Sequence, residues 1–112
     1  MIRLVKSPQG YAQIVHLDYG QTQKVVCGGG ATPVAATSDF LLSSSAVLLQ
    51  ATVDVHFKVS KNGTEATTED PIAWAKADRF IGVNSNGCKV SAIKVNGEAD
   101  GMLYITPLEE DR

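Results

Sequence analysis

Aromatic residues and basic clusters are scarce in this chain of 112 residues. Phe, Tyr and Trp make up 6% of it, with a single tryptophan, Trp74, and three scattered tyrosines. The tyrosines form no row, so the sequence has no aromatic platform of the kind on which sugars or bases stack. It also lacks a stripe of Lys and Arg, and sequence-independent binding of nucleic acid depends on such a positive surface. We therefore expect no nucleic-acid partner.

Cysteines and long apolar runs are also few. Cys27 and Cys88 lack the close spacing of a metal or redox motif, and such a pair is more often buried and free, which fits a reducing compartment. The most hydrophobic stretch, 40–51, is interrupted by serines and falls short of the roughly 20 apolar residues that cross a bilayer. No apolar core of signal length follows the start of the chain. The sequence predicts a soluble, unprocessed protein without a membrane partner.

Charge is balanced over most of the chain. The totals are 10 basic and 12 acidic side chains, and residues 109–112 hold three of the acidic and one of the basic ones, which leaves nine of each in residues 1–108. Apolar residues make up 44%, an ordinary share for a globular protein, and the length suffices for one hydrophobic core. We predict a single β domain over 1–108 and a short acidic tail at 109–112.

Catalytic signatures are missing as well. The three glycines at 28–30 are not followed by the Lys-Ser/Thr pair of a phosphate-binding loop and predict a flexible turn instead. The serines at 43–45 lack the strand-turn-helix elbow that exposes a nucleophile. From these patterns we expect neither enzymatic activity nor a cofactor.

The sequence is rich in alternation between apolar and polar residues. In "ATVDVHFKVS", residues 51–60, the alternation is strict, as in a strand with one buried and one solvated face. Because the pattern begins at Val47, it predicts one long core strand over 47–60. The solvated face of that strand would hold Thr52, Asp54, His56, Lys58 and Ser60.

Shorter strand patterns, separated by turn residues, flank this segment. Residues 11–17 and 22–27 predict two paired strands that open a meander across the turn "DYGQ". Strands at 88–95 and 102–106 close the chain. Together these patterns predict an all-β fold, a small antiparallel β-sandwich or barrel-like domain with at most one short helix.

Residues 70–83 carry two conflicting patterns. Asp70 before Pro71, with alanines after them, favours a helix, whereas residues 79–83 favour a strand, so both structures remain open. Trp74 lies in this segment. A lone tryptophan is more often part of the core, and an exposed anchor in a binding surface is the alternative.

Two His/Asp pairs are the only groups in the sequence that suggest a metal site. His16 and Asp18 are two residues apart, as are Asp54 and His56, so each pair would lie on one side of a strand. Neighbouring strands would bring four ligands together for zinc or manganese. Spacing within strands does not set the register between them, so we favour a solvated polar face and predict no metal site.

The second half of the chain has a distinctive pattern of strands and small-residue turns. Its features are the strand ending "VHFKV", the pair "AT" at 66–67, and the closing arrangement of "VSAI" followed by "GMLYIT". In these features residues 51–106 resemble small β-sandwich proteins found as virion components of tailed bacteriophages, including capsid decoration or cement proteins. The bulkier segment "DPIAWAKADRF" departs from that pattern.

The resemblance implies a non-enzymatic structural protein that is assembled in the bacterial host cytoplasm and located in the virion. Its partners would be capsid or other virion proteins, bound by a homo-oligomer or multivalent array whose many weak contacts add up. The contact surface would include the 61–69 turn and the segment that follows it. The candidate interface residues are Asn62, Trp74, Arg79 and Phe80.

Other classes of function remain open on the sequence alone. A ligand-binding β-module for carbohydrate or peptide would work as a free monomer, which light scattering distinguishes from an assembly. Another head-tail or tail component of a phage would bind a different virion surface. A metalloenzyme built on the two His/Asp pairs would retain metal after purification.

Overall fold

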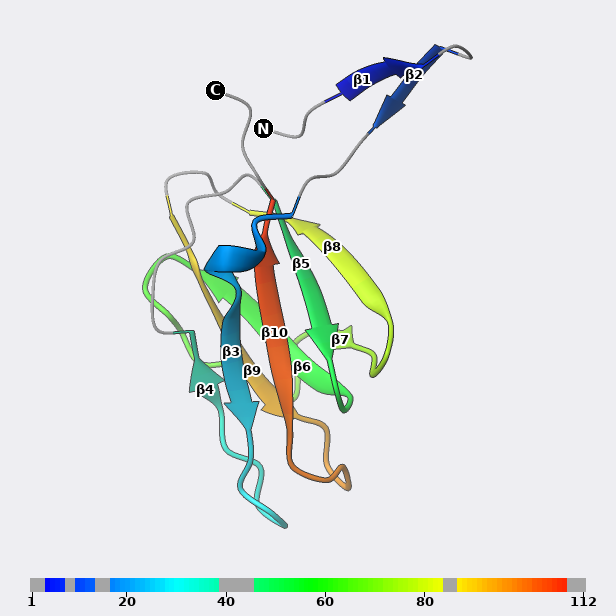
Figure 1. Ribbon diagram of the computed structural model, residues 1–112. Helices are drawn as coiled ribbons and strands as arrows, with labels where there is room; N and C mark the ends of the chain where they lie inside the picture. Colours follow the sequence, from blue (N-terminus) through cyan, green and yellow to red (C-terminus); the bar gives the residue numbers. More distant parts are fainter. Residues whose placement is uncertain (1–3, 8–9, 14–16, 39–45, 84–86, 109–112) are drawn as a thin grey trace.

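Two antiparallel sheets packed face to face make up the body of the protein (Figure 1). The computed structural model describes residues 4–7, 10–13, 17–38, 46–83 and 87–108. The only helix in this described part is the short 3-10 helix η1 (Tyr19–Gln21). The described ranges contain no helix that is long and apolar enough to cross a membrane. The fold is a small all-β sandwich, as the sequence predicts.

Each sheet of the sandwich has four strands. The first sheet has the order β3 (Gln23–Cys27), β10 (Gly101–Pro107), β5 (Ala46–Ala51) and β8 (Asp78–Gly82). The second sheet has the order β4 (Ala36–Thr37), β9 (Lys89–Lys94), β6 (Val55–Ser60) and β7 (Ile72–Ala73). A separate hairpin, which stands apart from the sandwich in Figure 1, consists of β1 (Leu4–Ser7) and β2 (Gly10–Gln13).

The core lies between the two sheets and consists mainly of aliphatic side chains. The largest fully buried ones are Leu49, Leu103, Ile105, Val25, Val47, Val55 and Val90. Cys27 and Cys88 are also buried and unbridged, as predicted, and burial raises the pKa of the Cys27 thiol to about 11. A thiol with so high a pKa stays protonated at neutral pH, so Cys27 acts as a small apolar side chain of the core.

The predicted long strand over 47–60 is two strands. β5 ends at Ala51, β6 begins at Val55, and the two belong to different sheets, with residues 52–54 as the corner between them. The alternation continues across the corner because the inner faces of both sheets point into one core. Periodicity therefore identified most of the side chains that face the core and missed the break.

This corner is held against the start of β10. The Thr52 N–H donates to the Met102 carbonyl oxygen, and the Met102 N–H donates to Thr52 Oγ1, both at 2.9 Å. A Cβ added at Gly101 would lie 2.6 Å from Thr52 Oγ1 and 2.7 Å from Val53 Cγ2. The close approach of the chain at the corner therefore requires glycine at position 101.

The predicted pairing of 11–17 with 22–27 is wrong. β2 ends at Gln13 and pairs with β1, whereas β3 pairs with β10, the last strand of the chain. A strand pattern indicates that a segment is extended, but it does not name the partner, which depends on residues far away in the sequence. Residues 14–16 and the predicted tail at 109–112 lie outside the described residues.

Residues 70–83 are extended rather than helical. The Asp70 carboxylate accepts a hydrogen bond of 2.8 Å from the Thr67 N–H and so closes a turn instead of starting a helix. The Pro71 carbonyl oxygen then accepts a hydrogen bond of 3.0 Å from the Phe57 N–H, next to β7. The chain continues into β7 and β8, which are edge strands of the two sheets.

The glycines at 28–30 form a tight turn between β3 and β4. Gly29 has a φ of +103°, and a Cβ there would collide with the Thr32 carbonyl oxygen and lie 2.9 Å from the Val34 nitrogen. Gly30 has a φ of +60°, but a Cβ there would meet no atom within 4 Å. The turn thus depends on Gly29 for space as well as for its backbone conformation.

This difference predicts unequal effects of two neighbouring substitutions. Gly30→Ala is expected to lower the free energy of unfolding by about 1 kcal/mol, the cost of a left-handed conformation. Gly29→Ala is expected to cost about 2 kcal/mol or more, because the turn must also move away from the new methyl group. Chemical denaturation of both variants measures the difference. Equal losses would show that Gly29 does not have the tight surroundings described.

Candidate interaction edge

One side of the sandwich is formed by β7, β8 and the connection at 74–77 that links them, which we call the β7–β8 edge (Figure 1). The connection carries the chain from the second sheet to the first. It is fixed by an isolated bridge between Ala51 and Ala75 and by the Lys76 N–H, which donates to the Ala51 carbonyl oxygen at 3.0 Å. The Asp54 carboxylate also accepts a hydrogen bond of 2.7 Å from the Ala75 N–H. The edge is therefore a well-fixed part of the fold.

Trp74 lies on this edge and is 58% exposed. The prediction that favoured the core for Trp74 is wrong. The inward position of β7 belongs to Ala73, which is 2% exposed and faces Val55 of β6 in the strand pairing. Trp74 follows it, where the chain leaves the sheet, so its ring is presented to solvent.

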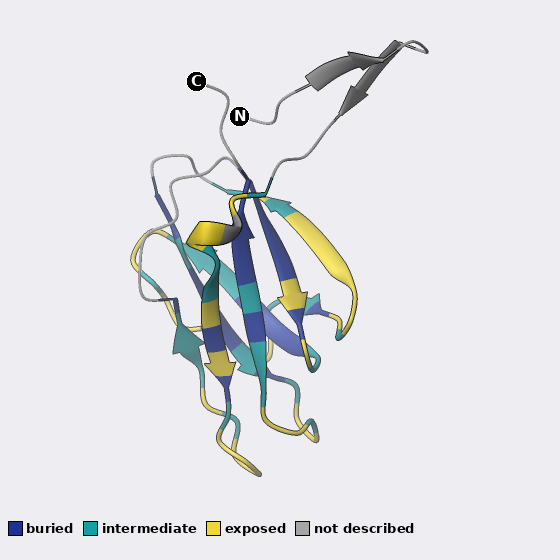
Figure 2. Ribbon diagram, viewed as in Figure 1, coloured by how far each residue is buried: buried dark blue, intermediate teal, exposed yellow. Residues whose placement is uncertain are grey.

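Phe80 and Arg79 lie on β8, the edge strand of the first sheet. Phe80 pairs with Leu48 on the outer face of that sheet, away from the core, and is 53% exposed. Arg79 points to the other side, where its guanidinium lies 5.2 Å from the centre of the Phe57 ring and Nη1 is 3.5 Å from the Ile72 carbonyl oxygen. Figure 2 shows most of β8 as exposed. Three of the four candidate interface residues thus share one edge.

Asn62, the fourth candidate, is not part of the β7–β8 edge. It is exposed and lies in the connection that follows the C-terminal end of β6, whereas β7 pairs with the N-terminal residues of that strand. The connection itself is anchored, because the Thr64 N–H donates to Ser60 Oγ at 2.8 Å and the Ala66 N–H donates to Ser91 Oγ at 2.9 Å. Hydrogen bonds therefore hold the segment 61–69 against β6 and β9 of the second sheet.

The polar face predicted for residues 52–60 is only partly solvated. Thr52 is exposed, but His56 is 8% exposed, and its Nδ1 lies 2.8 Å from the Asp70 carbonyl oxygen. Lys58 Nζ lies 3.6 Å from an Asp70 carboxylate oxygen. The prediction failed for His56 because the connection between β6 and β7 folds back over the outer face of the second sheet.

The His/Asp pairs do not assemble a metal site in the described part of the chain. Within it, no group of three or more His, Cys, Asp and Glu side chains is placed to hold a metal ion. Asp54 and His56 are instead engaged with the Ala75 N–H and the Asp70 carbonyl oxygen. His16 lies outside the described residues.

An ion pair between the buried Lys94 and the surface residue Asp100 is a feature that the sequence did not predict. Lys94 is 1% exposed, and its Nζ lies 2.6 Å from Asp100 Oδ1, which also accepts a hydrogen bond of 3.1 Å from the Gly30 N–H. The Lys94 ammonium, followed by the Gly30 N–H, holds the pKa of the Asp100 carboxyl below its usual value. The alternation along β9 could have revealed it. Lys94 comes two residues after Ala92 and four after Val90, which both point inward, so Lys94 points inward as well.

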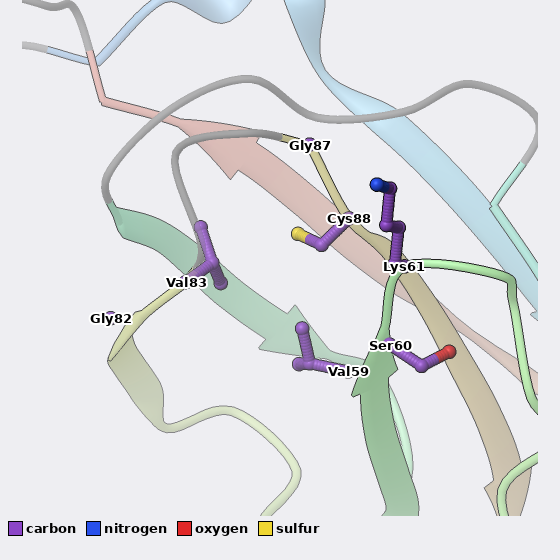
Figure 3. Close-up of a pocket in the computed structure, with 7 residues that line it drawn as sticks. All are labelled: Val59, Ser60, Lys61, Gly82, Val83, Gly87 and Cys88. Atoms are coloured by element: carbon purple, nitrogen blue, oxygen red, sulfur yellow. The ribbon is translucent and has the colours of Figure 1, made fainter.

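An open pocket of about 540 Å³ lies at the end of the sandwich where β6 and β8 finish (Figure 3). In Figure 3 the side chains of Val59, Val83 and Cys88 face a common space, while the Ser60 hydroxyl points away from it. The thiol of Cys88 is buried, and burial raises its pKa. The volume falls within the range of small-molecule sites.

Comparisons with protein-family models, with curated proteins and with solved structures gave no match to this chain. The structural features that bear on function are therefore the β7–β8 edge and the pocket.

Proposed function

We propose that the protein is a non-enzymatic virion structural protein, a decoration or stabilising protein of a tailed-bacteriophage capsid that binds the particle by multivalent surface contacts. The observation that carries the proposal is the β7–β8 edge, where Trp74 and Phe80 are exposed on a well-fixed part of the sandwich. Exposed aromatic side chains on rigid elements are typical centres of protein-protein contacts. The resemblance of residues 51–106 to decoration proteins supplies the class of partner.

Trp74 is the best anchor of the three edge residues. Arg79 is engaged with the Phe57 ring, and Phe80 lies within β8, where it pairs with Leu48. Trp74 belongs to a connection whose backbone is already fixed by several hydrogen bonds. Binding would therefore cost little conformational entropy beyond that of the Trp74 side chain. A decoration protein needs only a weak contact per copy, because a closed shell offers many equivalent sites.

A ligand-binding module is the second candidate, and the pocket at the end of the sandwich favours it. Two valines and a thiol face its interior, and Lys61 stands beside it with a positive charge. Such a site would suit a small ligand that combines an apolar part with an anionic group. This function would need neither a particle nor the β7–β8 edge.

We expect the purified protein to bind phage particles or empty shells that lack it, with copies counted by sedimentation and imaging. Trp74→Ala is expected to weaken retention about 30-fold, the equivalent of a hot spot of 2 kcal/mol, because the ring would be lost from the contact. The melting temperature of the free protein should stay nearly unchanged, since Trp74 is exposed.

Val26→Ala is the matched control for this experiment. Val26 is a similarly exposed apolar residue, 59% exposed, but it lies on β3 at the opposite edge of the first sheet. Its substitution should leave binding to the particle unchanged. Failure of the protein to bind any virion component at micromolar concentration, together with tight binding of a small ligand in the pocket, would reject the proposal in favour of the second candidate.

A further inference from the structure

The outer edge of β8 is an exposed strand edge of the sandwich. The other edge strands offer less. β4 and β7 have only two residues each, and β3 is connected to β4 by the turn at 29–32 and runs beside it. β8 has five residues, and within the described part of the chain no strand pairs with its outer side. Long exposed edges of this kind form hydrogen bonds readily with another strand.

We propose that two copies of this chain associate by antiparallel pairing of their β8 strands across a two-fold axis at Phe80. The two first sheets would then form one continuous sheet of eight strands. Because the contact joins copies of this chain, the proposal does not depend on binding to a virion. It assigns Phe80 to the contact between copies and leaves Trp74 for a different partner.

Alternation of side chains restricts the possible registers. In a continuous sheet, paired residues point to the same face, and Asp78, Phe80 and Gly82 share the outer face of β8 while Arg79 and Ile81 share the inner one. A two-fold antiparallel pairing must therefore be centred on a residue. Centring on Asp78 would oppose two carboxylates, and centring on Arg79 would oppose two guanidinium groups, both unfavourable.

Centring on Phe80 avoids every pair of like charges. Asp78 then lies opposite Gly82 of the second copy, and Arg79 lies opposite Ile81. Phe80 is the middle residue of β8, so this register alone pairs all five residues of the strand. The two Phe80 rings meet on the outer face, and aromatic pairs across strands are favourable. The length of the strand therefore selects this register, and the positions of the charges are compatible with it.

Cysteine cross-linking tests this register. Residues directly opposite in antiparallel strands have Cα atoms about 4.5–5.5 Å apart, within the range of a disulfide. Phe80→Cys should therefore form a dimer under mild oxidation. Asp78→Cys and Gly82→Cys should not cross-link alone, because each cysteine would lie roughly 13 Å from its copy in the second chain. A mixture of these two variants should cross-link as a heterodimer, and this mixture retains both Phe80 rings.

Wild-type protein provides the baseline, because Cys27 and Cys88 are both buried. Cross-linking of all three single variants at one rate would indicate random collision and reject the proposal. Absence of the heterodimer from the mixture would also reject the proposal. This test remains valid if Phe80→Cys forms no dimer because it has lost the aromatic pair, since the mixture retains both Phe80 rings. The virion proposal would survive either result, since it is tested by Trp74→Ala and particle binding.

Discussion

Phe57→Ala is expected to lower the free energy of unfolding by about 3–5 kcal/mol. Phe57 is the largest apolar side chain that β6 directs into the core, and it is 6% exposed. The guanidinium of Arg79 covers its ring from the β7–β8 edge, so truncation removes this contact and leaves a cavity between the sheets. The close packing of a small sandwich lets the neighbours collapse only partly into that space.

Urea denaturation followed by circular dichroism measures this loss. Trp74 fluorescence is a poor probe, because the ring is 58% exposed in the folded protein and its surroundings change little on unfolding. Val26→Ala is the control, and we expect it to change the free energy of unfolding by no more than about 0.5 kcal/mol, as is usual for an exposed residue. Similar losses for both variants would mean that Phe57 is not part of the core.

The sequence predicted which side chains of 47–60 are buried better than it predicted the path of their backbone. Val47, Leu49, Val55 and Phe57 are buried as the alternation requires. The corner between the two strands escaped detection because its cause is nonlocal. It forms where β10 begins, at a residue 49 positions further along, whose missing side chain makes room for Thr52 and Val53.

The sequence predicted which residues belong to the candidate site from their residue types. It did not predict where each of them lies in the fold or what surrounds it. Arg79 and Phe80 lie on one edge because β8 is the last strand of its sheet, which a strand pattern does not reveal. Trp74 is exposed because the inward position of β7 is occupied by the small Ala73. His56 is buried because a later connection covers it. Each outcome depends on how elements far apart in the sequence pack together, which local patterns leave open.

Asp100→Asn is expected to destabilise the protein strongly although Asp100 lies at the surface. Its carboxylate is the acceptor for the ammonium of Lys94, which is 1% exposed and has no other partner among the described residues. The neutral amide would leave the buried ammonium of Lys94 without a counterion, and removing the partner of a buried charge costs more than removing the charge itself. Lys94→Met, which fills the same space without a charge, should therefore destabilise the protein less than Asp100→Asn.

The pH dependence of this effect follows from the lowered pKa of Asp100. A carboxyl whose folded pKa lies below its unfolded value of about 3.9 adds stability above that value and loses it as the pH falls through the folded pKa. The difference in free energy of unfolding between wild type and Asp100→Asn should thus be constant from pH 7 to about pH 5 and shrink below about pH 4. In the Lys94→Met background, Asp100→Asn should have little effect at any pH, because the buried cation is gone. An equally large effect of Asp100→Asn in both backgrounds would show that the carboxylate stabilises the fold through the Gly30 N–H rather than through Lys94.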